Sequence, residues 1–205
     1  IALPNPVMPA SGTFGFGYEM AKWYDINCLG AIALKGTTLS ARYGNPLPRI
    51  AECDCGLLNA IGLQNPGVDA VIAEELPRLN AVYRGVKLAN ISGFSLEEYA
   101  ETAARLDGAD VDILEINISC PNVHGGGLAF GAGARNAARV CAEVKKRCRK
   151  PIYMKLSPNV TDICAIARAC EAEGADGLTV TNTLLGMVID PRSGKPIVST
   201  KMAGF

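Results

Sequence analysis

Residues 115–124 read Glu-Ile-Asn-Ile-Ser-Cys-Pro-Asn-Val-His, an apolar strand pattern that ends at a cysteine. Pro121 cannot donate a backbone hydrogen bond to a sheet, and three glycines follow at 125–127, so the strand ends near Ser119. Cys120 is therefore expected at the carboxyl end of this strand. In parallel α/β proteins ligands bind at that end, because the loops there vary without disturbing the packed strands.

Cys120 has two interpretations. A cysteine at an arbitrary position is most often a small buried apolar residue. The location of Cys120 favours catalysis instead, because it lies between the amides of Asn117 and Asn122 and precedes a glycine-rich loop. A thiol has a reference pKa of ~8.5, so a reaction that uses it as a base is expected to speed up as pH rises. A lone His124 beside glycines is more typical of a solvated side chain.

Apolar, β-rich runs alternate with helical patterns along the chain. The patterns at 96–106, 134–149 and 161–174 space apolar residues by three and four, as helices that cover a sheet do. The β-rich runs are apolar nearly throughout, which is typical of strands buried on both faces of a parallel sheet. Strands are predicted at 6–11, 31–36, 86–92, 113–119, 151–157 and 177–183.

Polar residues stand at the end of every predicted strand. A closed barrel gathers such ends around one site, whereas an open sheet spreads them apart. Residues 12–17 also lack the third glycine of a dinucleotide-binding loop. We therefore predict one domain over 1–205 with the TIM (β/α)8 barrel fold, truncated after about six repeats because a whole barrel takes ~250 residues. Both ends are expected to be cut, since the chain begins at Ile1. The polar strand ends are Ser11, Lys35, Ser92, Asn117 with Cys120, Lys155 with Ser157, and Asn182 with Thr183.

The composition is that of a globular protein, with 49% hydrophobic residues in 205. The 20 basic and 20 acidic residues balance, and the basic run at 145–147 is expected to be a solvated helix face, so no nucleic-acid surface is predicted. No run approaches the ~20 apolar residues of a membrane span, which predicts a cytoplasmic protein. Most of the eight cysteines lie in helix or strand patterns, which predicts reduced thiols. No metal site is predicted, because Cys53 and Cys55 form a close pair without a second pair at zinc-finger spacing.

Two segments rich in glycine and proline, 53–67 and 186–199, interrupt the repeats. The first contains Asn59 among apolar residues, which indicates a loop that presses on a bound ligand. An ordinary surface crossover is the alternative, because long loops are either functional or loosely ordered.

Seven motifs in one order resemble the catalytic subunit of class 1 dihydroorotate dehydrogenases. The resemblance covers almost the whole chain, and the sequence Gly-Gly-Leu-Ala-Phe-Gly at 126–131 makes the class 1B form the nearest match. The motifs lie at 11–15, 35–39, 42–46, 59–67, 117–123, 155–159 and 182–183.

The resemblance implies a TIM barrel that binds FMN across its strand ends and oxidises dihydroorotate to orotate in UMP biosynthesis. It implies that Cys120 is the base that removes a proton from C5 while a hydride leaves C6. It also places Lys155 near the flavin N1/O2 edge, where an ammonium stabilises the charge of the reduced ring. The implied cofactor set is Ser11, Lys35, Gly36, Asn117, Lys155 and Thr181.

Orotate accounts for the many asparagines in the motifs. Its planar ring alternates C=O and N–H groups, which amide side chains match without adding charge. Each asparagine alone is more typical of a turn or cap, so the prediction rests on their joint placement. The implied substrate set is Lys35, Asn59, Ala60, Ile61, Gly62, Leu63, Asn117, Asn122, Asn182 and Thr183.

The resemblance is incomplete in three places. The family binds the FMN phosphate in loops after the seventh and eighth strands, which this chain does not contain. Val188 stands where class 1B has arginine, and Gly36 where alanine is frequent. Class 1B membership implies a homodimer core and an electron-transfer subunit that carries FAD and a 2Fe–2S cluster and reduces NAD.

Four alternatives remain open at this stage. Class 1A chemistry passes electrons to fumarate, and a related dihydropyrimidine dehydrogenase acts on other pyrimidines. A truncated barrel is also compatible with a non-catalytic assembly fragment, whose open edge invites association. A flavin-free lyase would use Lys155 as a Schiff-base amine.

Overall fold

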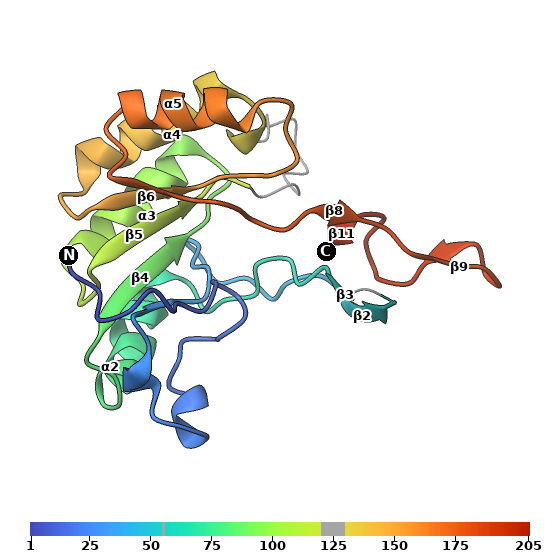
Figure 1. The fold of residues 1–205 in the computed structure, drawn as a ribbon, viewed down its shortest axis with the longest axis horizontal. Helices are drawn as coiled ribbons and strands as arrows, with labels where there is room; N and C mark the ends of the chain where they lie inside the picture. The colour runs from blue at the N-terminus through green and yellow to red at the C-terminus, as the bar shows by residue number, and fades with distance from the viewer. Residues whose placement is uncertain (55, 120–129) are drawn as a thin grey trace.

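The structure is a computed structural model that describes residues 1–54, 56–119 and 130–205. Its centre is a five-stranded parallel sheet in the order β1-β4-β5-β6-β7, which forms a half-barrel (Figure 1). This sheet confirms the predicted parallel barrel architecture. The strands are β1 (Ala31–Ala33), β4 (Val86–Ile91), β5 (Ile113–Asn117), β6 (Ile152–Lys155) and β7 (Gly177–Thr179).

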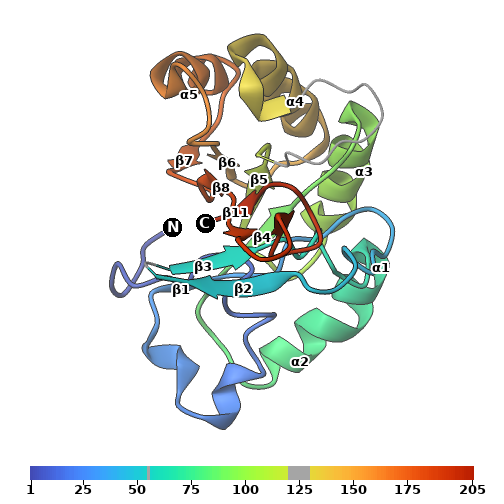
Figure 2. The same cartoon turned by 90° about the vertical axis from the view of Figure 1, so that its right-hand side faces the viewer.

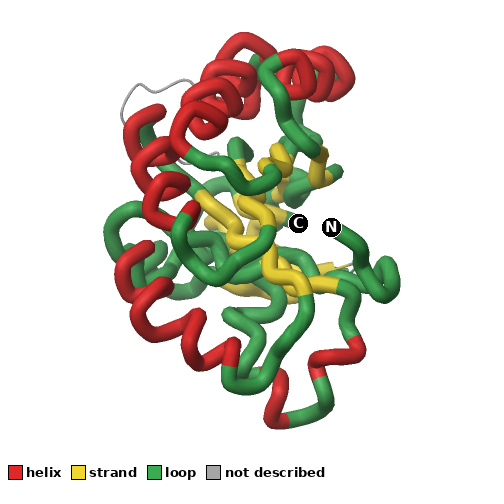
Figure 3. The backbone as a smooth tube through the Cα atoms, turned by 90° about the vertical axis from the view of Figure 1, so that its left-hand side faces the viewer, coloured by secondary structure: helices red, strands yellow, loops and turns green. Residues whose placement is uncertain are grey.

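Helices surround the outer face of this sheet, as Figure 2 shows from one side and Figure 3, with helices in red, from the other. All three predicted helices are confirmed as α3 (Leu96–Asp107), α4 (Ala134–Arg147) and α5 (Ile163–Ala172). A further helical segment, not predicted, precedes β4. It comprises α1 (Val68–Ala70), the π-helix η3 (Val71–Glu75) and α2 (Leu76–Asn80); the short 3-10 helices are η1 (Met20–Lys22), η2 (Ile26–Cys28) and η4 (Phe130–Ala132).

Helix ends follow the capping residues that the sequence supplies. The Ser95 side chain accepts a hydrogen bond from the Glu98 backbone N–H at 3.1 Å and so caps α3. Asp162 caps α5 in the same way through the N–H of Ala165. Gly174 follows α5 with a φ of +88°, a conformation that favours glycine at helix ends. Within the described residues, no helix combines the length and apolar character needed to cross a membrane.

The two faces of the parallel sheet bury different residues, because side chains alternate along a strand. Leu114 and Ile116 of β5 belong to the large core that the helices complete. Ile113 of the same strand belongs to a separate small cluster on the opposite face, the inside of the half-barrel. The other members of that inner cluster are Ala31, Ala33, Val86, Leu88 and Tyr153.

A second, antiparallel sheet lies beyond the carboxyl ends of the parallel strands, on the right of Figure 1. It has the order β2-β3-β11-β8 and its own small core around Leu58 and Val198. None of its strands was predicted from the sequence, and the strand at 56–59 lies in the segment 53–67 that was read as a loop. Its strands are β2 (Ile50–Cys53), β3 (Gly56–Asn59), β8 (Leu185–Gly186) and β11 (Ala203–Gly204), and β9 (Ile189–Asp190) pairs with β10 (Lys195–Pro196) nearby.

The strand predicted at 6–11 is wrong, so the parallel sheet has five of the six predicted strands. Pro4, Pro6 and Pro9 remove the backbone donors that a ladder in this segment would need. The segment instead runs beside β1, where the Val7 carbonyl accepts a hydrogen bond from the Gly30 N–H at 2.9 Å.

Candidate active site

The inner face of the half-barrel changes from apolar to polar toward the carboxyl ends of the strands. Side chains alternate along β5, so Glu115 and Asn117 lie on the same face as Ile113, two and four residues further along the strand. The register then sets Asn90 beside Glu115 and Lys155 beside Asn117. A polar layer therefore lies above the apolar inner cluster, and its members are Asn90, Glu115, Asn117, Lys155 and Thr179.

Glu115 is the centre of this layer and is only 2% exposed. One carboxylate oxygen accepts a hydrogen bond from the Asn90 amide at 2.6 Å, and the other accepts one from the Thr179 hydroxyl at 2.7 Å. The Lys155 ammonium lies 3.9 Å from the first of these oxygens. A buried carboxylate is costly unless it is paired, and here three strands supply the compensation.

Two lysines of the inner face have ammonium groups that donate no hydrogen bond within the described residues. The Lys155 side chain is 8% exposed, and its ammonium lies 3.9 Å from the Glu115 carboxylate. The Lys35 ammonium lies over Gly12, at 3.9 Å from the position of an added Cβ. Burial lowers the pKa of Lys35 below its usual 10.5, and repulsion by Arg49 lowers it further. Cations in this condition favour an anionic or electron-rich ligand.

Asn117 joins the ends of three strands. Its amide donates to the Ser92 hydroxyl at 3.1 Å, and its oxygen accepts from the Asn182 amide at 3.0 Å. The Tyr99 hydroxyl of α3 donates to the Asn117 carbonyl at 2.7 Å. The structure thus brings together Asn117 and Asn182, two of the predicted substrate residues, although they are far apart in the sequence.

The predicted loop residues approach the same end of the sheet. The amide of Asn59 donates to the Gly204 carbonyl at 3.4 Å, and a Cβ on Gly204 would meet the Thr183 hydroxyl oxygen at 2.5 Å. Asn59 and Thr183 therefore lie on either side of β11. The Leu63 side chain reaches Gly36, 3.8 Å from the position of an added Cβ.

The backbone of this loop is fixed by a neighbouring segment. The Ala60 N–H donates to the Arg49 carbonyl at 2.7 Å, and the Ile61 carbonyl accepts from the Asn45 N–H at 3.0 Å. Gly62 has a φ of +75°, and an added Cβ there would lie 2.7 Å from the Asn45 backbone nitrogen. Only glycine fits both the conformation and the space at this position.

The remaining predicted cofactor residues have different surroundings. The Ser11 hydroxyl donates to the Leu34 carbonyl at 2.6 Å, which holds it at the end of β1. Gly36 is buried directly after Lys35. Thr181 is exposed, and within the described residues its side chain joins none of these hydrogen bonds.

Cys120, Asn122 and His124 lie outside the described residues. The chain enters that segment from within the polar layer. The Ser119 N–H donates to the Asn117 side-chain oxygen at 3.1 Å, and the Ser119 hydroxyl donates to the Lys155 carbonyl at 3.3 Å. The base role of Cys120 stays a prediction.

Three of the described cysteines are buried thiols that do not suit nucleophilic or base catalysis. All six are free thiols. Burial raises the pKa of Cys141 and of Cys148 to about 11, and that of Cys170 to about 12, so these thiols stay protonated at neutral pH. Among the residues with described positions, no cluster of three or more His, Cys, Asp or Glu side chains is arranged to hold a metal ion.

Three polar residues of the site were not predicted from the sequence. Glu115 and Thr179 each interrupt an apolar run, and they were read as parts of strands. Alternation carries the missing signal, because Glu115 stands two residues before Asn117 and must share its face. The three residues are Asn90, Glu115 and Thr179, whereas Ser92 was among the predicted polar strand ends.

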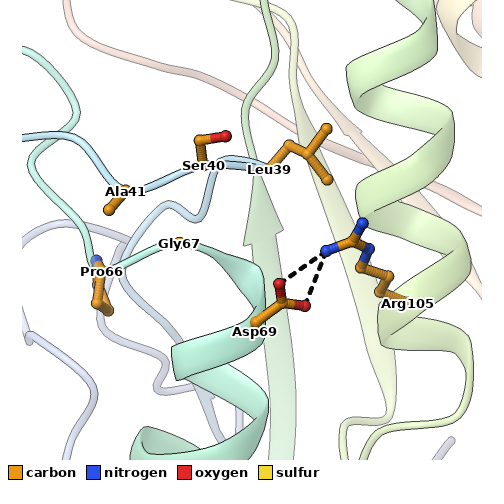
Figure 4. A pocket seen from close by; sticks show the side chains of 7 residues that line it. All are labelled: Leu39, Ser40, Ala41, Pro66, Gly67, Asp69 and Arg105. Carbon is orange, nitrogen blue, oxygen red and sulfur yellow. Dashed lines mark hydrogen bonds and ion pairs between the residues drawn. The ribbon is translucent and has the colours of Figure 1, made fainter.

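Two surface cavities lie away from this polar layer. Figure 4 shows one of about 320 Å³ between the segment after β1 and helices α1 and α3, where Arg105 donates to both carboxylate oxygens of Asp69 at 2.8 Å. The other, of about 440 Å³, lies between β2 and the β9 hairpin and includes Glu52 and Ile189. Neither is lined by Lys35, Lys155 or the asparagines, so we place the candidate site at the polar layer.

Comparison with known proteins points to one family. A model of the family described as Dihydroorotate dehydrogenase matches residues 1–205. Three similar curated proteins carry the name "Dihydroorotate dehydrogenase B (NAD(+)), catalytic subunit". They come from Anoxybacillus flavithermus (57% identical), Geobacillus kaustophilus (54%) and Enterococcus faecalis (52%), each over 206 aligned residues that cover the whole of this chain. The chain spans 66% of the length of each of these relatives, just under two thirds.

Proposed function

The chain belongs to the dihydroorotate dehydrogenase family, and we propose that it catalyses the FMN-dependent oxidation of dihydroorotate to orotate in UMP biosynthesis. The observation that carries this proposal is the pair of inner lysines, Lys35 and Lys155, whose ammonium groups have no hydrogen-bond acceptor within the described residues. They lie at the same end of a parallel half-barrel as the amides of Asn117 and Asn182. Cations and amides in one layer suit a planar, anionic heterocycle.

The residues present also fit a flavin. A Cβ added at Gly12 would have the Lys35 ammonium as its nearest neighbour, at 3.9 Å, so a cation faces the backbone of residue 12 near the end of β1. Residues that would hold FMN are Ser11, Lys35, Gly36, Asn117, Lys155 and Thr181. When bound, FMN supplies the acceptor for the hydride of dihydroorotate. Lys155 would stabilise the negative charge that the ring gains on reduction.

The substrate is held by amides and by the 59–63 loop. Asn59, Asn117, Asn122 and Asn182 pair with the C=O and N–H groups of the pyrimidine ring, assisted by Thr183 and by the loop backbone. Lys35 contacts both substrate and cofactor. Cys120 takes the proton from C5, and as a thiol base it makes the rate rise with pH.

Electron transfer onward requires a partner. The names of the relatives describe a catalytic subunit of an NAD(+)-dependent enzyme. We therefore infer a homodimeric core bound to a subunit with FAD and a 2Fe–2S cluster, acting in the cytoplasm. Copurification with a red iron–sulfur flavoprotein supports this partner, whereas fumarate reduction without one supports class 1A chemistry.

The anaerobic visible spectrum tests the proposed reaction directly. The full-length protein is loaded with FMN, and dihydroorotate is added without oxygen or any other acceptor. We expect the flavin absorbance to bleach as the ring is reduced. A bound flavin that stays oxidised would reject dihydroorotate as the substrate, and bleaching by dihydrouracil alone would favour the dihydropyrimidine dehydrogenase alternative. Absence of FMN binding would reject the proposal as a whole.

The lowered pKa of Lys35 predicts a loss of orotate affinity at alkaline pH. The ammonium is charged below its pKa, and that pKa lies below 10.5, so the attraction for an anion is present at neutral pH and disappears as pH rises through the lowered value. We expect the dissociation constant to rise by up to about tenfold per pH unit above it.

Fluorescence titrations of orotate between pH 7 and 10.5 measure this effect. Lys35→Met is the matched control, because it removes the titrating group and leaves the ionisation of orotate unchanged. The Lys35→Met protein should bind orotate more weakly than the native protein. Its dissociation constant should not show the rise with pH that Lys35 causes in the native protein. Identical pH profiles for the two proteins would contradict the assignment of Lys35.

A further inference from the structure

Glu115 lies in the centre of the site, yet the proposed reaction gives it no role. It occupies the middle of β5, with two strands of the parallel sheet on each side of it. Its side chain is buried, and the polar partners that it has among the described residues offer protons or positive charge. These neighbours come from three strands: Asn90 of β4, Lys155 of β6 and Thr179 of β7.

The distance between Glu115 and Lys155 is informative. At 3.9 Å from the carboxylate oxygen, the Lys155 ammonium is attracted but lies beyond hydrogen-bond range. The carboxylate has its hydrogen bonds from Asn90 and Thr179, at 2.6 and 2.7 Å. The three N–H groups of Lys155 are therefore left for a ligand while Glu115 holds the charge in position.

Asn90 in turn has its place because residue 36 is glycine. A Cβ at Gly36 would lie 2.9 Å from the Asn90 side-chain oxygen, which is closer than such contacts normally are. An alanine here would displace the amide that donates to Glu115. The end of β1 and the carboxylate on β5 are thus coupled through Asn90.

From this geometry we propose that Glu115 is a positioning residue that sets the reduction potential of the bound flavin through Lys155. The inference rests on the proposed function, because it takes the Lys155 ammonium to face the flavin. The negative charge of Glu115 offsets part of the positive charge of Lys155. Reduction adds negative charge to the flavin, so Glu115 keeps the potential lower than Lys155 alone would make it.

Glu115→Gln tests this charge with little change of shape. The glutamine oxygen can accept from Asn90, and its amide can donate to the Thr179 hydroxyl, which rotates to accept. We expect the midpoint potential of the FMN-loaded, full-length protein to move to a more positive value. The ratio of reduced to oxidised flavin at a fixed potential should rise at least tenfold, which is about 30 mV for a two-electron couple.

The measurement is an anaerobic redox titration against a reference dye, and it does not depend on dihydroorotate. Glu171→Gln is the matched control, because it removes the same charge from an exposed site on α5 and should leave the potential unchanged. If Glu115→Gln does not fold, Glu115→Asp serves instead. The shorter aspartate side chain moves the negative charge further from Lys155 without removing it. The midpoint potential should therefore shift in the same direction by a smaller amount.

An unchanged or more negative potential in the variant that folds would overturn the role of Glu115. A shift equal to that of the Glu171→Gln control would overturn it as well. Failure of the proposed function looks different, because the native protein would then bind no FMN or show no bleaching with dihydroorotate.

Discussion

Replacement of Cys120 with alanine is expected to slow the reduction of bound FMN by dihydroorotate by ~10²–10⁴, the usual contribution of a positioned general base. FMN affinity should change little, since the cofactor set of the proposal lies on other residues. The variant should also lose the rise of the rate with pH, because the titrating thiol is gone. Anaerobic stopped-flow absorbance, recorded across pH 6–9, measures both effects.

The matched control is Cys164→Ala, which removes an exposed free thiol from α5. It should leave both the rate and the pH profile as they are. A Cys120→Ala protein that reduces its flavin at the native rate would remove this residue from the mechanism. It would also direct attention to the other polar groups at the strand ends.

Lys155→Met should have the second-largest effect, a fall of ~10²–10³ in the rate of flavin reduction. Loss of one preorganised donor to a developing negative charge typically costs this much. Stopped-flow reduction at saturating dihydroorotate separates this loss from weaker substrate binding. Lys146→Met, at an exposed position on α4, is the control and should react at the native rate. A native rate in Lys155→Met would exclude Lys155 as the group that stabilises the reduced flavin.

The same substitution should also destabilise the fold, because it leaves the Glu115 carboxylate buried without its cation. Breaking a buried pair from one side commonly costs ~3–5 kcal/mol. Adding Glu115→Gln to Lys155→Met removes the uncompensated charge and should restore part of the free energy of unfolding. Denaturant titrations of the single and double variants measure this recovery. If the double variant is no more stable than Lys155→Met alone, then Lys155 does not stabilise the buried charge of Glu115.

The sequence predicted the parallel half-barrel because its signals are local. Each buried strand is an apolar run, each covering helix has its own periodicity, and residues such as Ser95 mark the helix ends. The same rule failed at 6–11, where an apolar run contains prolines that cannot join a ladder. Hydropathy predicted a strand in this run, but its prolines lack the backbone N–H groups that a strand ladder needs.

The candidate site was predicted in part. Polar residues at strand ends were expected to gather, and Asn117 and Asn182 do meet. Glu115 was missed because it lies within an apolar run that was read only as a strand, although its spacing from Asn117 places both on one face, and its partners come from neighbouring strands. The antiparallel sheet was missed for a related reason. Its strands have two to four residues, too few for a recognisable period.

The pairing of β11 with β3 also has a consequence for the order of folding. The hydrogen bond between Asn59 and Gly204 joins residues 145 positions apart, a far longer separation than that between paired residues of neighbouring strands in the parallel sheet. Contacts of such long sequence separation form slowly, because the loop between them must first lose its freedom. The parallel strands and their helices are therefore expected to assemble early. The antiparallel sheet around Asn59 and Thr183 is expected to form last. A newly made chain is therefore expected to acquire its parallel scaffold before it brings Asn59 and Thr183 together.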